Sequence, residues 1–170
     1  MGKKSVKENK NIYFQSREQA NLTRAQASEL MEFISESRIE KIESEKSGIH
    51  PEEVVAMAEA YKNPSLCNYF CSNECRIGQD YVPEVKLSSL AEISLGILAS
   101  INSLNLQKER LIEIAEDGHL TEDELPDFFS IHDRLDKLSL AVDSLKLWME
   151  HAIANNDLDK ESIKKYLKDQ

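Results

Sequence analysis

The apolar positions in the second half of the chain recur at steps of three and four, which is the spacing of one helix face. The first run predicts a helix of about thirty residues, and Gly118 is placed to end it in a left-handed conformation. Thr121 to Glu124 has the pattern of a capping box that opens a second long helix. Because the connection is short, the two helices should lie antiparallel. The two runs are Leu90, Ile93, Ile97, Ile101, Leu104, Leu111 and Ala115, followed by Leu125, Phe128, Ile131, Leu135, Leu138, Val142, Leu145, Met149 and Ala152.

The first half shows shorter periodic segments that are separated by capping residues. After a first helix from Ile12 to Ala20, Thr23 and Ser35 are typical N-caps for the second and third helices. Pro51 suits the first position of a fourth helix, and a short fifth segment holds the cysteines. No β pattern appears, so the sequence predicts an all-α protein: a five-helix domain and a long-helix hairpin with a short terminal helix over Lys160–Leu167.

Composition divides the chain into the same two parts. Residues 77–170 carry 10 Lys and Arg against 19 Asp and Glu, whereas residues 1–76 carry 11 against 12. The acidic half should repel nucleic acid, so only the near-neutral half could approach a phosphate backbone. The expected organisation is a mobile N-terminus at 1–10, a domain at 11–75, a linker at 76–86 and an acidic helical domain at 87–170. Neither a secretory signal nor a membrane-spanning run is found, so a cytoplasmic protein is expected.

The first half resembles the helix-turn-helix domain of the Cro/phage-repressor type, the xenobiotic-response-element family. Roughly residues 10–62 carry the resemblance, although the turn before helix 3 is one residue longer and Glu32 stands near where the family often has glycine. The resemblance implies a bacterial or phage-derived transcriptional regulator. The matching elements are Arg17-Glu18, Leu22-Thr23-Arg24, Ser28, Ile34-Ser35, Arg38 to Glu43, Pro51 and Val54 to Tyr61.

In that family the start of helix 3 reaches base edges in the major groove. Carried over by position, the base-facing residues are Ser35, Glu36, Ser37 and Lys41, and the phosphate contacts are Arg24 and Lys46. The resemblance also implies binding to palindromic double-stranded DNA as a homodimer. An isolated hairpin cannot bury both sides of its helices, so the acidic domain is expected to pair with a second copy.

The charge of helix 3 favours a second interpretation. Glu36 and Glu40 lie on or near the face that should enter a polyanion, and the domain lacks a basic footprint. A carboxylate can accept a hydrogen bond from cytosine, but it gains nothing from phosphate. The alternative is therefore an adaptor that keeps the fold and binds a protein partner.

Three cysteines recur every four residues at Cys67, Cys71 and Cys75. Core packing is one interpretation, since free cysteine behaves as a small apolar residue. A zinc site completed by His50 or water, or a redox switch, remains the alternative, although the spacing lacks the tight turn of CxxC. Neither a catalytic triad nor a glycine-rich phosphate loop is visible, so no enzyme is expected and no cofactor other than this zinc.

Overall fold

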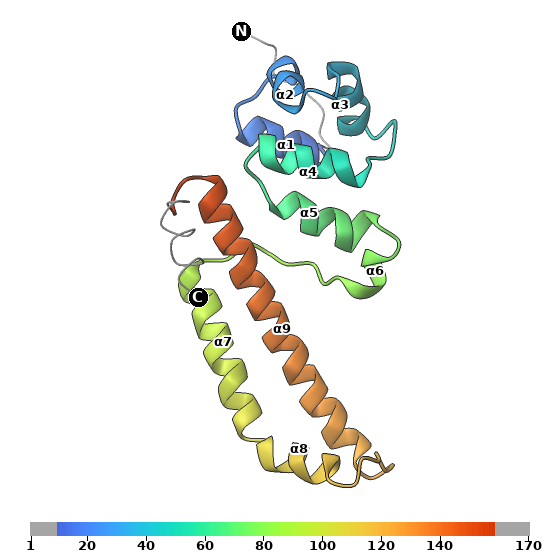
Figure 1. Cartoon of the computed structure of the whole chain (residues 1–170), viewed down its shortest axis with the longest axis vertical. Coiled ribbons are helices and arrows are strands. Elements are labelled where there is room, and N and C mark those ends of the chain that lie inside the picture. The colour runs from blue at the N-terminus through green and yellow to red at the C-terminus, as the bar shows by residue number, and fades with distance from the viewer. Residues whose placement is uncertain (1–9, 159–170) are drawn as a thin grey trace, which may run out of the picture. The chain divides into compact units, whose positions relative to one another are not determined.

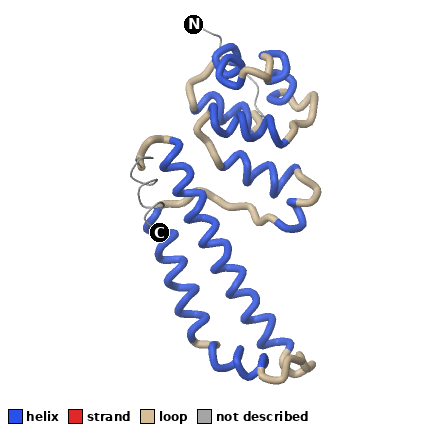
Figure 2. The backbone as a smooth tube through the Cα atoms, viewed as in Figure 1, coloured by secondary structure: helices blue, strands red, loops and turns tan. Residues whose placement is uncertain are grey.

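In a computed structural model the residues described, 10–158, form helices joined by loops and contain no strand (Figures 1 and 2). They divide into two compact units, one with residues 10–84 and 150–158 and the other with Val85–Met149. None of the helices in this described range is long and apolar enough to cross a membrane. The predicted all-α class is confirmed.

The first unit contains the five predicted helices, each beginning at the expected residue or close to it. Asn11, Thr23 and Ser35 cap the first three through side-chain oxygens that accept backbone N–H groups, and Pro51 opens the fourth. The bounds are α1 Ile12–Gln19, α2 Arg24–Met31, α3 Glu36–Glu43, α4 Pro51–Ala60 and α5 Ser65–Tyr69.

One core holds these helices together. The central side chains are inaccessible to solvent, and each of the five helices or its adjoining residues contributes at least one of them. Burying an aliphatic or methionine side chain contributes about 1.5–3 kcal/mol, so this core is the main source of the unit's stability. Its members are Tyr13, Ala27, Met31, Ile34, Ile39, Ile42, Val54, Met57, Ala58, Tyr61 and Leu66.

The predicted linker at 76–86 is partly structured. After α5 the chain continues as a π-helix, η1 (Phe70–Glu74), and then makes one further helical turn, α6 (Gly78–Tyr81). A Cβ on Gly78 would lie 2.0 Å from the backbone oxygen of Cys71, so only glycine allows this close approach. The first half of the predicted linker is therefore part of the unit. The sequence did not predict this because the segment is held by tertiary packing, and such packing produces no hydrophobic periodicity in the sequence.

The second unit is a helical hairpin in which α7 and α9 run antiparallel, as predicted (Figure 1). Its helices are α7 Leu90–Asn105, α8 Lys108–Ala115 and α9 Leu125–Ala154. The expected single helix over 90–115 is wrong, because the chain leaves the α-helical path at Leu106 and Gln107. Asn102, Ser103 and Asn105 precede the break, and such side chains compete with the helix for backbone groups.

The turn of the hairpin keeps two predicted features. Gly118 has a positive φ of 71°, and both the backbone N–H and the hydroxyl of Thr121 donate to the Glu124 carboxylate. Arg110 of α8 then pairs with Asp127 of α9 at 2.7 Å, which holds the turn against the second long helix.

Much of the predicted apolar seam is exposed. Of its positions Ile93, Ile131 and Ala152 are buried, but Leu90 and Ile101 expose 43% and 41% of their surface. The same holds on α9, where three of the exposed apolar positions recur at steps of seven: Leu135, Val142 and Met149. We call the set Leu90, Ile101, Leu135, Val142 and Met149 the apolar flank. Two helices alone cannot cover it.

The acidic domain also differs from the predicted range of 87–170. The second unit begins at Val85, and residues 150–158 belong to the first unit, where Asn155 donates to the Lys62 carbonyl at 3.5 Å. The predicted terminal helix over Lys160–Leu167 and the mobile N-terminus at 1–9 lie outside the described residues.

Candidate nucleic-acid interface

Helices α2 and α3 are held at a defined angle by a short turn between them. Thr23 and Gln26 form a complete capping box at the start of α2, and the Ser28 hydroxyl donates to the carbonyl of Ile34 at 2.8 Å. Ile34 and Ile39 are buried beneath the turn. This packing presents the first turn of α3 at the surface.

The turn itself carries a strained residue. Glu32 has φ 56° and ψ −52°, and the Phe33 N–H donates to the Met31 carbonyl at 2.6 Å, which closes a three-residue γ-turn. Only glycine adopts a positive φ without cost. In the Cro-type resemblance, glycine often stands near this position.

Replacing Glu32 with glycine is expected to stabilise the protein by about 1 kcal/mol, because the relief of strain exceeds the added chain entropy. The midpoint of urea unfolding measures the change. Glu29→Gly on the exposed face of α2 is the matched control, and it should destabilise by about 1 kcal/mol. Equal destabilisation by both variants would contradict the argument from strain.

The four residues predicted to face bases all lie exposed at the start of α3 or one turn later. Ser35 is also the N-cap, since its hydroxyl accepts the Arg38 N–H at 3.2 Å. The side chains of Glu36, Ser37 and Lys41 have no hydrogen-bond or ion-pair partner within the described range. They are available to a ligand.

Arg24, a predicted phosphate contact, already has a partner. Its Nε donates to Glu43 Oε2 at 2.8 Å. Arg17 donates to both oxygens of the same carboxylate, from Nε to Oε1 and from Nη2 to Oε2. The Glu43 side chain is 1% exposed and that of Arg24 is 37% exposed. Glu43 therefore binds both arginines, and only part of the Arg24 guanidinium reaches solvent. The sequence pattern places Glu43 at the end of helix 3, but it does not indicate this contact between residues 19 positions apart.

Arg38 holds the loop that follows α3. It forms a two-point contact with Glu53, both at 2.6 Å, and also donates to Ser47 and to the Gly48 carbonyl. The hydrogen bond from Arg38 lowers the pKa of Glu53. The stability from this pair is therefore present above the usual pKa of glutamate, and is lost as pH falls through the lowered pKa. Lys46, exposed at the start of this loop, forms no ion pair with a described residue.

Residues 15–65 match the helix-turn-helix family. The match includes α2, the turn and α3, together with the buried positions that orient them. This segment is a Cro/phage-repressor-type helix-turn-helix domain. At the family level it is the domain of a DNA-binding regulator. No curated protein and no solved structure matches the chain.

The surface charge of this helix-turn-helix domain is unusual for a partner of DNA. Of its cations, Arg17, Arg24 and Arg38 are each paired with glutamate. Lys41 and Lys46 are the unpaired cations that α3 and the loop after it provide within the described structure. Several exposed carboxylates surround them: Glu29, Glu32, Glu36, Glu40 and Glu45. Phosphate attraction from this face is therefore weak.

The three cysteines adjoin the helix-turn-helix domain but do not come together as a metal site. Cys67 packs against the core, and burial raises the pKa of its thiol. All three are free and partly buried, on a segment that changes from α-helix to π-helix at Phe70. Among the residues the structure describes, the group whose ligand atoms lie within 4.8 Å of one another is instead His132, Asp133 and Asp136, exposed on α9. Zinc at the cysteines, with His50 or water, stays a prediction that elemental analysis can check.

Proposed function

We propose that this protein is a sequence-specific transcriptional regulator that acts as a homodimer in the cytoplasm of a bacterium. Helix α3 enters the major groove, and two copies pair through the apolar flank of the hairpin. The family is one of regulators and not of enzymes.

The observation that carries the proposal is the exposed first turn of α3 within a matched helix-turn-helix domain. Ser37 and Lys41 are four residues apart, so they share one helix face. Hydroxyl and ammonium groups donate to base edges, and Glu36 can accept from cytosine N4. Their lack of partners in the described structure means that no protein contact must break before DNA binds.

Phosphate contacts are assigned to Lys46 and to the exposed part of Arg24. Because Arg24 is also bound to Glu43, its contribution to affinity should be smaller than that of a free arginine. The affinity of one copy for one DNA half-site is then low. Most of the affinity comes from a dimer that binds two half-sites at once.

The apolar flank supports pairing between two copies of the hairpin. Leu135, Val142 and Met149 repeat every seven residues on α9, which is the spacing along which helices pack in bundles. Solvent-exposed aliphatic side chains in such a row favour association. A second identical hairpin offers the same row, so a two-fold four-helix bundle would cover both.

Glu36→Gln is expected to raise affinity for random duplex DNA several-fold, because it removes a negative charge from the face that approaches phosphate. Preference at the contacted base should relax by roughly 1–3 kcal/mol if the carboxylate reads cytosine. Fluorescence anisotropy at two salt concentrations measures the first effect, and selection from a random DNA library measures the second.

Glu59→Gln on the last turn of α4 is the matched control, since it changes net charge equally outside α3. It should leave base preference unchanged and alter affinity little. If the two variants behave alike, α3 does not lie in the groove.

A second function is favoured by the exposed apolar residues of the turn. Leu30 and Phe33 expose 60% and 66% of their surface, next to the acidic positions Glu29 and Glu32. Such a patch suits a protein partner better than DNA. An adaptor would bind no duplex DNA at low salt, and Phe33→Ser would abolish its partner binding.

A further inference from the structure

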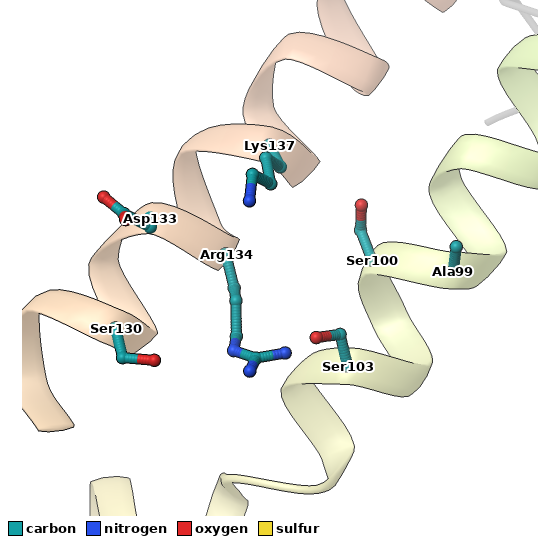
Figure 3. A pocket seen from close by; sticks show the side chains of 7 residues that line it. All are labelled: Ala99, Ser100, Ser103, Ser130, Asp133, Arg134 and Lys137. Carbon is teal, nitrogen blue, oxygen red and sulfur yellow. The ribbon is translucent and has the colours of Figure 1, made fainter.

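A cavity of about 330 Å³ lies between α7 and α9 within the hairpin. Ala99, Ser100 and Ser103 line it from α7. The α9 side is lined by one carboxylate, two cations and a hydroxyl: Asp133, Arg134, Lys137 and Ser130. In Figure 3 the Arg134 guanidinium extends from α9 toward α7, where the Ser103 hydroxyl points toward it. The Lys137 side chain lies closer to α9, and the Ser100 hydroxyl points along α7. The volume is that of a small-molecule site.

The two cations of this cavity are unpaired in an acidic unit. Residues 85–149 contain twelve Asp and Glu but six Lys and Arg. Nevertheless, Arg134 and Lys137 form no ion pair or hydrogen bond with any residue in the described range. Asp136, next to Lys137, instead lies 3.1 Å from His132, and the Asp133 carboxylate points away from Arg134 in Figure 3. The positive charge is therefore directed at the cavity.

The serine hydroxyls are also available. Elsewhere in the hairpin Ser94 and Ser144 donate to the carbonyl four residues earlier, at 2.7 and 2.8 Å. Ser100 and Ser103 form no such bond in the described structure, so their hydroxyls remain free to donate into the cavity. Together with Arg134 and Lys137 they provide more donors than the two oxygens of a carboxylate require, and enough for the three oxygens of a phosphate group.

Ser130, one of the lining residues, is in contact with Gln107, which does not itself line the cavity. The Gln107 amide donates to Ser130 at 3.5 Å, while its Oε1 is buried and accepts no hydrogen bond from the described residues. The remaining polar lining, Ser130 and Asp133, can bind hydroxyl groups. Since the cavity is also larger than one phosphate ion, an ester of phosphate with a hydroxylated molecule fits it better than the free ion.

We propose that this cavity is a binding site for a phosphate group, carried by a small hydroxylated ester. Arg134 binds two phosphate oxygens through its planar fork, and Lys137 and the α7 serines bind the third. The ligand crosses from α9 to α7, so binding stabilises the hairpin.

The apolar flank leaves this site open. At 3.6 residues per turn, Leu90 and Ile101 fall on one side of the α7 face that meets α9, whereas Ser103 falls on the other. On α9, Leu135 and Lys137 are separated in the same way. A dimer formed through the flank therefore does not cover the cavity, and the proposal does not depend on DNA binding.

The test uses the full chain, with inorganic phosphate, glucose 6-phosphate, glucose and succinate as probes. Isothermal titration calorimetry gives affinities, and amide chemical shifts locate the site. We expect saturable binding of both phosphate probes, with shifts confined to residues around 99–103 and 130–137. Glucose should not bind, and succinate should bind at least about tenfold more weakly.

Arg134→Gln with Lys137→Gln should lower phosphate affinity at least about tenfold, which is the loss of two charge-assisted contacts. Lys146→Gln, an exposed α9 lysine already paired with Asp143, is the control and should change nothing. Tighter binding of glucose 6-phosphate identifies the ester as the source, and tighter binding of inorganic phosphate identifies the free ion. Equal affinity for succinate, shifts elsewhere, or phosphate binding retained in the double variant would each overturn the proposal.

Discussion

Leu135→Asp with Val142→Asp is expected to make the protein monomeric and to weaken binding to a palindromic DNA site by about 100-fold or more. Both side chains are exposed in a single chain, by 45% and 39%, so an aspartate there can keep its carboxylate in water. In a paired bundle the same aspartates would be buried without a partner, which costs several kcal/mol. Sedimentation should show twice the 19.4 kDa chain mass for the unchanged protein and the single mass for the variant.

Leu140→Asp is the matched control on the same helix. Leu140 is 39% exposed, as Val142 is, but two residues along a helix place it on the opposite side. It should remain dimeric and keep its DNA affinity. Circular dichroism checks that both variants stay helical. A dimer that survives the double change, or that is lost through Leu140→Asp, would show that the apolar flank is not the contact.

Glu43→Gln is expected to lower the free energy of unfolding by about 3 kcal/mol, because it removes the buried countercharge of Arg17 and leaves only Glu18, which is 40% exposed and lies 3.2 Å from Nη1. The Arg17 side chain is 6% exposed, and its Nε and Nη2 both donate to the Glu43 carboxylate. Urea unfolding measures the loss. The Leu22 carbonyl, which accepts from Arg17 Nη1 at 2.6 Å, cannot replace a negative charge.

Two comparisons make this test specific. Glu53→Gln removes the partner of Arg38, which is more exposed at 23%, so it should cost only about 1 kcal/mol. Arg17→Met with Glu43→Leu removes both buried charges, and should be more stable than Glu43→Gln alone. Equal losses for Glu43→Gln and Glu53→Gln would refute the central role of the buried carboxylate.

The starts of the helices could be predicted because they depend on neighbouring residues. Thr23, Ser35 and Pro51 act on backbone groups within one turn, so the local sequence is enough to predict their effect. The break at Leu106 was missed for the opposite reason. The apolar residues keep their helical spacing across the break, so periodicity alone predicts one continuous helix. The weak helix formers around Asn105 do not change that spacing.

The sequence by itself determined the all-α class, the capped helix-turn-helix and the acidic hairpin, since these follow from periodicity, capping and charge over short distances. Tertiary structure alone decided which charges are available. Arg24 and Glu43 lie 19 positions apart, yet their contact reduces the positive charge of the candidate interface. Likewise, Ser103 and Arg134 face one cavity because α7 and α9 pack antiparallel. Packing brings residues together that are far apart in the sequence, and no local sequence pattern predicts which of them form contacts.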